Sequence, residues 1–202
     1  MRFELTKEIK EHFKTDPVMY SIMDKYPLPE RGVNPDHFDE LVRSIIYQQV
    51  SIKAGATIFS RLKAKYNVTP VELYQADKDD VQSVGLSFRK VEYIKALSKA
   101  VIDGDVHFKD IEEMSNKEII DMLVSVRGIG VWTAEMFLMF SLGRLDVNSY
   151  GDLAIRRGFK NLYKLESEPS KKEFMKKVDT WSPYSTIAHF YLWFASGEME
   201  FL

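Results

Sequence analysis

The sequence predicts an all-α protein. In almost every segment, apolar residues recur at intervals of three and four positions, as they do on the buried face of a helix. Helix-capping residues stand directly ahead of several of these segments, and no segment convincingly alternates apolar and polar residues as a half-buried strand would. Hydrophobic residues make up 45% of the 202 residues, which is enough for a sizeable core in one or two compact domains.

The first third of the chain carries three expected helices. One is predicted over residues 6–25, followed by a break at Pro27 and Pro29. Asn34 is a capping residue and Pro35 suits a first helical position, so a second helix follows. Its apolar residues repeat at helical spacing: Phe38, Leu41, Val42, Ile45 and Ile46. The third helix has the apolar residues Ile52, Ile58, Phe59 and Leu62.

Capping boxes, in which a Ser or Thr is followed three residues later by Glu, mark the start of further helices. Three such boxes begin at Thr69, Ser115 and Ser170. Gly85 is expected to stop a helix. The long helix after it has the apolar residues Val91, Ile94, Leu97 and Val101. We expect Ser182 and Pro183 to open the last helix and Gly197 to end it.

Charge and composition limit the classes of partner. The formal net charge of −2 argues against a general polyanion binder, which would be basic. Basic residues nevertheless outnumber acidic ones between positions 125 and 164: Arg127, Arg144, Arg156, Arg157, Lys160 and Lys164 against Glu135, Asp146 and Asp152. A second basic cluster contains Arg89, Lys90, Lys95 and Lys99. Such faces suit weak, salt-sensitive contact with DNA, although the second cluster could equally be a solvated helix face.

The sequence contains no cysteine, which excludes disulfides, thiolate zinc sites and iron–sulfur clusters. We expect no cofactor and no metal bound by side chains. We expect no signal peptide in the first ten residues, which carry five charged residues and no long apolar run, and no apolar stretch is long enough to span a membrane. We therefore expect no membrane partner.

A glycine pair, Gly128 and Gly130, lies between two apolar helical runs and predicts a tight corner between two helices. The first backbone N–H groups of the second helix have no acceptor within the helix, and the helix dipole is positive there. Such a corner can bind a nucleic-acid phosphate through the backbone alone, and the carbonyl groups of residues 125–130 could hold a cation. The alternative is a mere connection between two core helices.

The longer pattern around this corner supports the first interpretation. Residues 126–134 read Val-Arg-Gly-Ile-Gly-Val-Trp-Thr-Ala, and Asp152 follows within the Gly-Asp-Leu-x-Ile-Arg-Arg-Gly run of residues 151–158. The stretch resembles the helix-hairpin-helix base-excision DNA glycosylases, most closely the 3-methyladenine DNA glycosylase II (AlkA-like) branch. The resemblance implies one helical bundle over residues 32–145 that contains the hairpin. A second bundle would comprise residues 1–31 and 146–202, with a substrate cleft between the two.

The resemblance also implies the chemistry. A base alkylated at a ring nitrogen is already a cationic leaving group, so one carboxylate that stabilises the developing oxocarbenium-like sugar is sufficient. Asp152 is the expected catalytic residue, although alone it would be an ordinary helix N-cap. Asp146 is the competing carboxylate and is structural in the family pattern. Trp132 stands where bifunctional relatives carry lysine, so we expect a monofunctional enzyme that leaves an abasic site.

The remaining site residues follow from the same resemblance. Phe88 is expected to fill the gap left by the flipped base; the alternative is that it merely packs against the first turn of the next helix. Residues 47–51 read Tyr-Gln-Gln-Val-Ser and match the family's Gln-Gln-x-Ser helix junction, so Gln49 and Ser51 could bind DNA near the lesion; equally, the paired amides Gln48 and Gln49 could cap two helix ends. The expected hairpin contacts to DNA are Arg127, Gly128, Gly130 and Thr133. The expected pocket residues are Trp193, Trp132, Met136 and Tyr47. The chain departs from the family pattern at Gly151, Ser185, Met136 and Leu153, which shifts the expected base preference.

The sequence thus predicts an enzyme that flips alkylated purines of the 3-methyladenine type out of double-stranded DNA and excises them. We expect a monomer that acts where chromosomal DNA lies, in a prokaryotic cytoplasm or a nucleus. Three alternatives remain at this point. They are a glycosylase for mismatched or deaminated bases, a non-catalytic helix-hairpin-helix protein that binds DNA or senses damage, and a helical adaptor for a protein partner.

Overall fold

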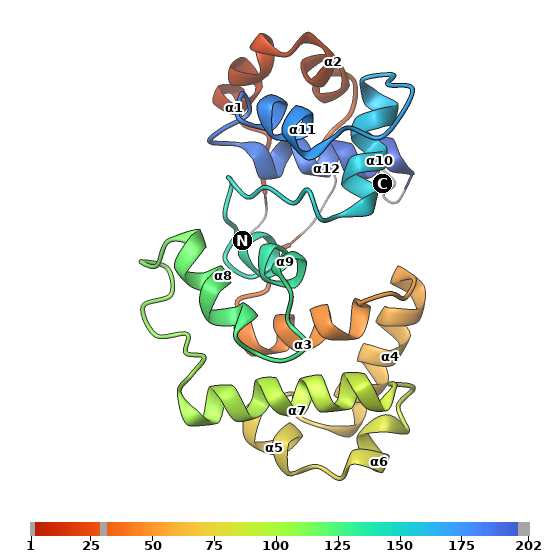
Figure 1. Cartoon of the computed structure of the whole chain (residues 1–202), viewed down its shortest axis with the longest axis vertical. Helices are drawn as coiled ribbons and strands as arrows, with labels where there is room; N and C mark the ends of the chain where they lie inside the picture. The colour runs from red at the N-terminus through yellow and green to blue at the C-terminus, as the bar shows by residue number, and fades with distance from the viewer. Residues whose placement is uncertain (1–2, 29–31, 198–202) are drawn as a thin grey trace. The chain divides into compact units, whose positions relative to one another are not determined.

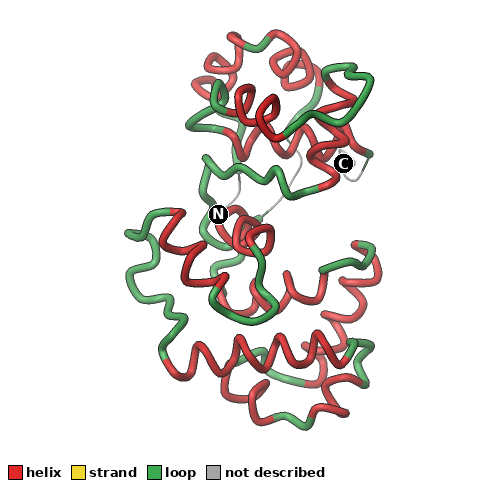
Figure 2. Tube along the Cα trace, viewed as in Figure 1, coloured by secondary structure: helices red, strands yellow, loops and turns green. Residues whose placement is uncertain are grey.

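The computed structural model describes residues 3–28 and 32–197, and within them it confirms the all-α prediction (Figure 2). The described residues form α-helices α1 to α12 and one short 3-10 helix, η1, with no strand. The chain divides into two compact units (Figure 1). We call Asn34–Leu142 the hairpin unit, and Met1–Val33 with Gly143–Leu202 the terminal unit. The boundaries expected from sequence were residues 32 and 145.

Seven helices build the hairpin unit. They are α3 (His37–Tyr47), α4 (Ile52–Lys65), α5 (Pro70–Gln75), α6 (Lys78–Gln82), α7 (Phe88–Asp103), α8 (Asn116–Val124) and α9 (Val131–Phe140). Helix α3 packs against α4, α7 and α9, while α7 covers α5 and α6 (Figure 1). The five apolar residues predicted for α3 are all buried, because α3 is enclosed by these neighbours. This core carries the hairpin between α8 and α9.

Six elements build the described part of the terminal unit. They are α1 (Lys7–His12), η1 (Phe13–Thr15), α2 (Pro17–Lys25), α10 (Leu153–Leu162), α11 (Lys171–Val178) and α12 (Ser185–Ser196). Helix α12 is buried along most of its length and packs against α10 and α2. Gly158 of α10 faces the backbone of Leu192 in α12 so closely that a Cβ atom there would overlap the Leu192 carbonyl. None of the described helices combines the length and apolar character needed to cross a bilayer.

Two N-terminal predictions were wrong in detail. The single helix expected over residues 6–25 is broken, because the Asp16 side chain accepts a hydrogen bond from the Met19 N–H (3.2 Å) and starts α2 at Pro17. Likewise, α3 is capped by Asp36 rather than by Asn34. Asn34 instead stabilises the turn before the helix, because its Oδ1 accepts a hydrogen bond from the Asp36 N–H (3.1 Å). Pro27 lies beyond the end of α2 as expected, and Pro29 lies outside the described residues.

The capping boxes at Ser115 and Ser170 are confirmed with both reciprocal bonds. The third box is only half formed, because Glu72 accepts from the Asn67 N–H instead of from its N-cap residue. The last helix begins at Ser185 rather than at Ser182, whose hydroxyl donates to Asp146 Oδ2 (2.6 Å). Its predicted end at Gly197 is confirmed, with the glycine in the left-handed conformation that terminates helices.

Candidate functional site

The hairpin between α8 and α9 contains two glycines in different environments. Gly128 has φ +96°, and a Cβ atom on it would overlap the ring of Tyr93 in α7. Gly130 is the N-cap of α9 with φ −99°, a value any residue can adopt, and nothing lies within 4 Å of where its Cβ would be. Gly128 is therefore required by the turn, while Gly130 leaves the start of α9 open to a ligand.

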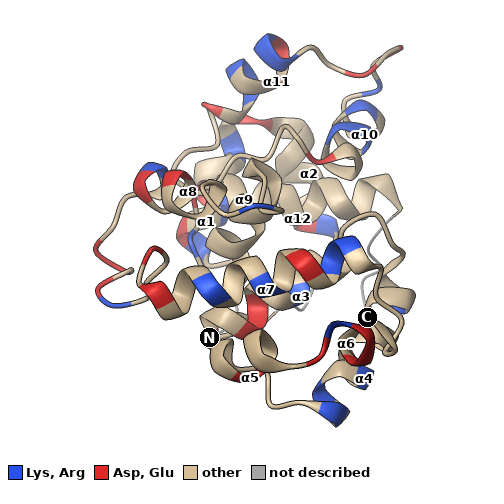
Figure 3. Ribbon diagram, turned by 60° about the horizontal axis from the view of Figure 1, so that its bottom comes forward, with Lys and Arg blue, Asp and Glu red and all other residues tan. Residues whose placement is uncertain are grey.

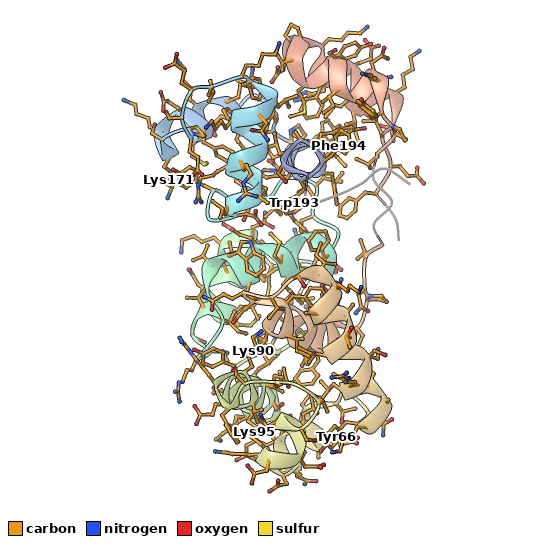
Figure 4. The ribbon with its side chains drawn as sticks, turned by 90° about the vertical axis from the view of Figure 1, so that its right-hand side faces the viewer. Tyr66, Lys90, Lys95, Lys171, Trp193 and Phe194 are labelled. Atoms are coloured by element: carbon orange, nitrogen blue, oxygen red, sulfur yellow. The ribbon has the colours of Figure 1, made fainter. Side chains whose placement is uncertain are left out.

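Gln48 holds the hairpin from within. Its Nε2 atom donates hydrogen bonds to the Gly128 carbonyl (3.0 Å) and to Thr133 Oγ1 (3.2 Å). Lys90 at the start of α7, labelled in Figure 4, in turn donates to the carbonyls of Ile46 (2.6 Å) and Gln48 (2.7 Å). These bonds connect the end of α3, the start of α7 and the hairpin into one polar network. Burial lowers the pKa of Lys90.

This network changes the interpretation of two residues. Thr133 was expected to contact DNA, but its side chain is only 2% exposed and receives the bond from Gln48, so in this structure it supports the hairpin from inside. Lys90 was expected on a basic surface, but it stabilises carbonyls at the end of α3. The sequence pointed to Gln48 only as one of two paired amides that could cap helix ends, and its bonds to the hairpin were not expected.

The rest of the second basic cluster is also engaged within the protein. Lys95 donates to the carbonyl of Tyr74 (2.7 Å) near the end of α5, Lys99 pairs with Asp103, and Arg89 bonds the Tyr93 hydroxyl. Along α7, basic and acidic residues alternate in patches (Figure 3). Lys90 and Lys95 are therefore engaged by carbonyl groups within the protein, whereas Arg89 and Lys99 lie exposed, and whether this cluster contacts DNA stays a prediction.

Other expected DNA contacts are exposed on the hairpin unit. Phe88, the first residue of α7, is 55% exposed, so it does not simply pack against the first turn. Gln49 is exposed at the corner between α3 and α4 and has φ +57°. Ser51 is the N-cap of α4, accepting from the Ala54 N–H (3.2 Å). Arg127 is exposed and forms an ion pair with Glu92 (3.2 Å).

The carbonyls of residues 125–130 were expected to hold a cation. The Val126 carbonyl accepts from the Ile129 N–H (3.1 Å), and the Gly128 carbonyl accepts from Gln48. Since a carbonyl oxygen has two lone pairs, both retain capacity for a cation, and this site stays a prediction. Val131 at the start of α9 is an exposed apolar residue beside the hairpin that sequence reasoning did not single out.

The expected pocket residues lie in both units. In the hairpin unit, Met136 is buried, Trp132 is half-buried, and the Tyr47 ring has the Arg43 guanidinium 4.9 Å from its centre. In the terminal unit, Trp193 is buried on α12, edge-on to the ring of Phe190 with centroids 5.8 Å apart. Their sharing of one pocket stays a prediction.

Asp152 caps α10 in the terminal unit. Its Oδ1 accepts a hydrogen bond from the Ile155 N–H (3.0 Å), and the residue is 8% exposed. The helix begins with Leu153, as the sequence predicted, and its positive N-terminal end faces this carboxylate. The N-cap interpretation of Asp152 is therefore confirmed as geometry, and it is compatible with a chemical role, because capping fixes the side chain.

The segment that leads to Asp152 is fastened to α12. Asp146 accepts from the hydroxyls of Ser182 and Ser185 (2.6 Å each), which gives it the supporting role expected of it. The Val147 N–H donates to Thr186 Oγ1 (3.2 Å). The fully buried ring of His189 accepts from the Ser149 N–H (3.5 Å) at Nε2 and donates to the Ser185 carbonyl at Nδ1. Sequence reasoning missed His189, which lies 37 positions from Asp152 in the chain.

Burial lowers the pKa of His189 to about 4 from its ordinary 6.5, against the opposing effect of the Asp152 and Asp146 charges. The ring is therefore neutral at physiological pH, as its hydrogen bonds require, with the proton on Nδ1.

Comparison with known proteins agrees with this geometry. Residues 42–183 match the model of the family described as HhH-GPD superfamily base excision DNA repair protein. DNA-3-methyladenine glycosylase 1 of Schizosaccharomyces pombe is 38% identical over 171 residues, which cover 82% of this chain and 75% of that protein.

Two solved structures are similar over nearly their whole length. One is the S. pombe 3-methyladenine DNA glycosylase in complex with abasic DNA, with a TM-score of 0.83 and 32% identity over 93% of this chain and 95% of that chain. The other is DNA-3-methyladenine glycosidase from Bacillus halodurans, with a TM-score of 0.84 and 36% identity over 98% of this chain and 93% of that chain. This chain therefore belongs to the HhH-GPD superfamily of base excision DNA repair proteins, in the branch of the DNA-3-methyladenine glycosylases.

Proposed function

We propose that this protein is a monofunctional DNA glycosylase that excises alkylated purines of the 3-methyladenine type from double-stranded DNA and leaves an abasic site. The single observation that carries the proposal is Asp152, a carboxylate held at the N-terminus of α10 in a chain that also carries the glycine hairpin. The similarity to glycosylases named for 3-methyladenine, one of them solved with abasic DNA, supports the same substrate class.

DNA binding begins at the hairpin unit. The open backbone at Gly130, followed by the N-terminal turn of α9, suits one DNA phosphate. Phe88 and Gln49 project from the same unit as exposed side chains, an apolar one and an amide. In the proposal they enter the duplex when the damaged nucleotide leaves the stack, Phe88 replacing its stacking and Gln49 its hydrogen bonds.

The chemical step breaks the bond between the deoxyribose C1′ atom and the base nitrogen. Because the alkylated ring carries positive charge, the base leaves with the bonding electrons as a neutral molecule and needs no proton. The sugar becomes an oxocarbenium-like cation, which the Asp152 carboxylate stabilises until water adds at C1′. The cap bond from the Ile155 N–H keeps the carboxylate in place during this step.

The proposal includes no lyase step. Schiff-base chemistry needs an amine close to C1′, and Trp132 occupies the hairpin position where a lysine would serve. The protein would act as a monomer on damaged chromosomal DNA, since each proposed element of the site lies within one chain. Trapping with borohydride on an abasic duplex should yield no covalent adduct, and an adduct would contradict the monofunctional part of the proposal.

A base-release panel tests the substrate class. Methylated genomic DNA reports release of 3-methyladenine, while defined duplexes carry 7-methylguanine, hypoxanthine or ethenoadenine. We expect faster release of the cationic methylated bases than of neutral hypoxanthine, because neutral bases are poorer leaving groups. If a folded protein that binds DNA releases nothing, it is a damage-binding protein without activity. If it releases only hypoxanthine, it belongs to another lesion class.

A further inference from the structure

Arg156 folds back over the start of its own helix. It lies one turn into α10, and its backbone N–H donates to the Asp152 carbonyl (3.2 Å). The Nη1 atom of its side chain donates to the carbonyls of Tyr150 (2.8 Å) and Gly151 (3.3 Å), the two residues immediately before Asp152. One residue therefore binds three consecutive carbonyl groups that end at the proposed catalytic aspartate.

The guanidinium is itself held in place. Its Nε atom donates to Glu168 Oε2 (3.0 Å), and its Cζ atom lies 5.3 Å from the centre of the Tyr150 ring. The Tyr150 hydroxyl donates to the Pro169 carbonyl (3.1 Å), and its ring contacts Phe174 in α11. The turn before Asp152 is thus fixed by groups from α10, α11 and the segment between them.

This arrangement differs from what a helix alone favours. A cation in the first turn of a helix is opposed by the positive end of the helix dipole, so helix stability does not explain Arg156. The carbonyls of Tyr150 and Gly151 explain the presence of an arginine here, because a planar guanidinium can donate to these carbonyls and to Glu168 at the same time. If these carbonyls rotated, the backbone angles of Asp152 would change, and its carboxylate would move with them.

We propose that Arg156 is a positioning residue for the glycosylase reaction: it fixes the turn of Tyr150 and Gly151 and thereby the orientation of the Asp152 carboxylate. This inference rests on the proposed function of Asp152. It assigns Arg156 a part in the rate of base release and none in DNA affinity. A lysine could keep the charge, but it lacks the planar pair of donors, so it would restore the orientation only in part.

The test compares Arg156→Ala with Arg157→Ala, which removes the same charge one position along the helix. Single-turnover release of 7-methylguanine from a duplex gives the rate, and binding to a duplex with a tetrahydrofuran abasic analogue gives the affinity. We expect Arg156→Ala to lose about 10- to 100-fold in rate, the scale of a misplaced catalytic group. Its affinity should fall no further than that of Arg157→Ala. Added guanidinium ion, below denaturing concentrations, should restore part of the rate of Arg156→Ala only.

Equal rates for the two alanine variants would overturn the inference. So would a loss of rate that merely follows a loss of affinity, or one that guanidinium leaves unchanged. Should Arg156→Ala fail to fold, Arg156→Lys decides: a slower rate at unchanged affinity supports positioning, and an unchanged rate refutes it. Asp152→Asn is measured beside them. If Asp152→Asn keeps full activity, the proposed function of Asp152 is wrong. If Asp152→Asn loses activity while Arg156→Ala stays fully active, only the inference about Arg156 is wrong.

Discussion

Gly128 and Gly130 show how two residues of one type, two positions apart, meet different needs. Gly128 has left-handed backbone angles and packs under the ring of Tyr93, so its hydrogen side chain is a requirement of the fold. Gly130 has ordinary angles and faces open space. We infer that the absence of a side chain at Gly130 serves a ligand, which in the proposed function is a DNA phosphate.

Substitutions should separate these two roles. Gly128→Ala should lower the free energy of unfolding by at least about 1–3 kcal/mol, the cost of a strained backbone position, before the overlap with Tyr93 is counted. Gly130→Leu should leave thermal stability nearly unchanged and weaken binding to lesion and undamaged duplexes alike, since a phosphate contact carries no sequence information. Unchanged DNA affinity in a folded Gly130→Leu protein would place the phosphate contact elsewhere.

His189 makes stability depend on pH in a known direction. Its pKa is lowered to about 4 in the folded protein, so between this value and 6.5 the unfolded chain binds the proton more readily. Stability contributed by the neutral ring is therefore present above about pH 6.5 and is lost as the pH falls, by at most about 3 kcal/mol near pH 4. Urea unfolding at pH 7, 6 and 5 should show a steeper decline for wild type than for His189→Gln. Parallel declines would exclude this role.

Helix α7 combines an exposed tip with an anchored first turn. Phe88 begins the helix, and two residues later Lys90 ties it to the carbonyls at the end of α3. Gln48 extends the network to the hairpin. The structure therefore supports Phe88 on a firm base, as insertion into a base stack requires.

Truncating this tip should affect duplex substrates selectively. Phe88→Ala should slow base release from duplex DNA more than from single-stranded DNA, because only the duplex needs its stack held open. Ile102→Ala is a matched control at the other end of α7, where the side chain is 47% exposed. If Phe88→Ala slows base release equally on both substrates, Phe88 has a packing role. If Ile102→Ala slows release from the duplex as much as Phe88→Ala does, the loss of any exposed apolar side chain of α7 explains the effect.

Local signals in the sequence predicted several helix starts correctly. The sequence predicted almost none of the contacts between residues that lie far apart in the chain. The capping boxes at Ser115 and Ser170 and the start of α10 after Asp152 depend on residues three positions apart, and the structure has them as expected. The bonds from Gln48 to Gly128 and from Lys90 to Gln48 span 80 and 42 residues. The spacing of apolar residues gives no sign of such pairs, so the bonds from Lys90 to the end of α3 were not expected.

The sequence did not predict two helix boundaries at which a side chain forms a tertiary hydrogen bond. Asp16 caps α2, and its other oxygen accepts from the buried Trp181 side chain (2.9 Å) and from the Tyr163 hydroxyl (2.6 Å). Ser182 bonds Asp146 instead of capping α12. In both places a tertiary contact set the boundary, which a single sequence does not display.

At the scale of the whole molecule, each unit has its own core, and the proposed functions divide between them. The hairpin unit carries the expected DNA contacts, and the terminal unit carries Asp152 with the groups that hold it. Chain connectivity makes the terminal unit from both ends of the sequence, so its assembly depends on contacts between distant segments. The bonds from Trp181 and Tyr163 to Asp16 are such contacts. Within the C-terminal part of the unit, α10 and α12 approach each other closely at Gly158.

Gly158→Ala should therefore destabilise one unit selectively. The new methyl group would overlap the Leu192 carbonyl, and forcing the helices apart in a packed core costs about 1–3 kcal/mol or more. Amide hydrogen exchange should accelerate in α10 and α12 while α3 and α9 retain their protection. If α3 and α9 lose protection equally, the two units unfold as one cooperative body.

Single-turnover base release with Asp152→Asn measures whether the Asp152 carboxylate carries the chemistry. Asparagine keeps the shape and can still cap α10, but it has no charge to stabilise the sugar cation. We expect the variant to bind lesion duplex about as well as wild type and to release 7-methylguanine at least about 100-fold more slowly. We expect a larger loss of rate for neutral hypoxanthine, because it is a poorer leaving group than a cationic base. Near-full activity of Asp152→Asn, together with no activity in a folded Asp146→Asn protein, would show that Asp152 is only a helix cap and that Asp146 carries the chemistry.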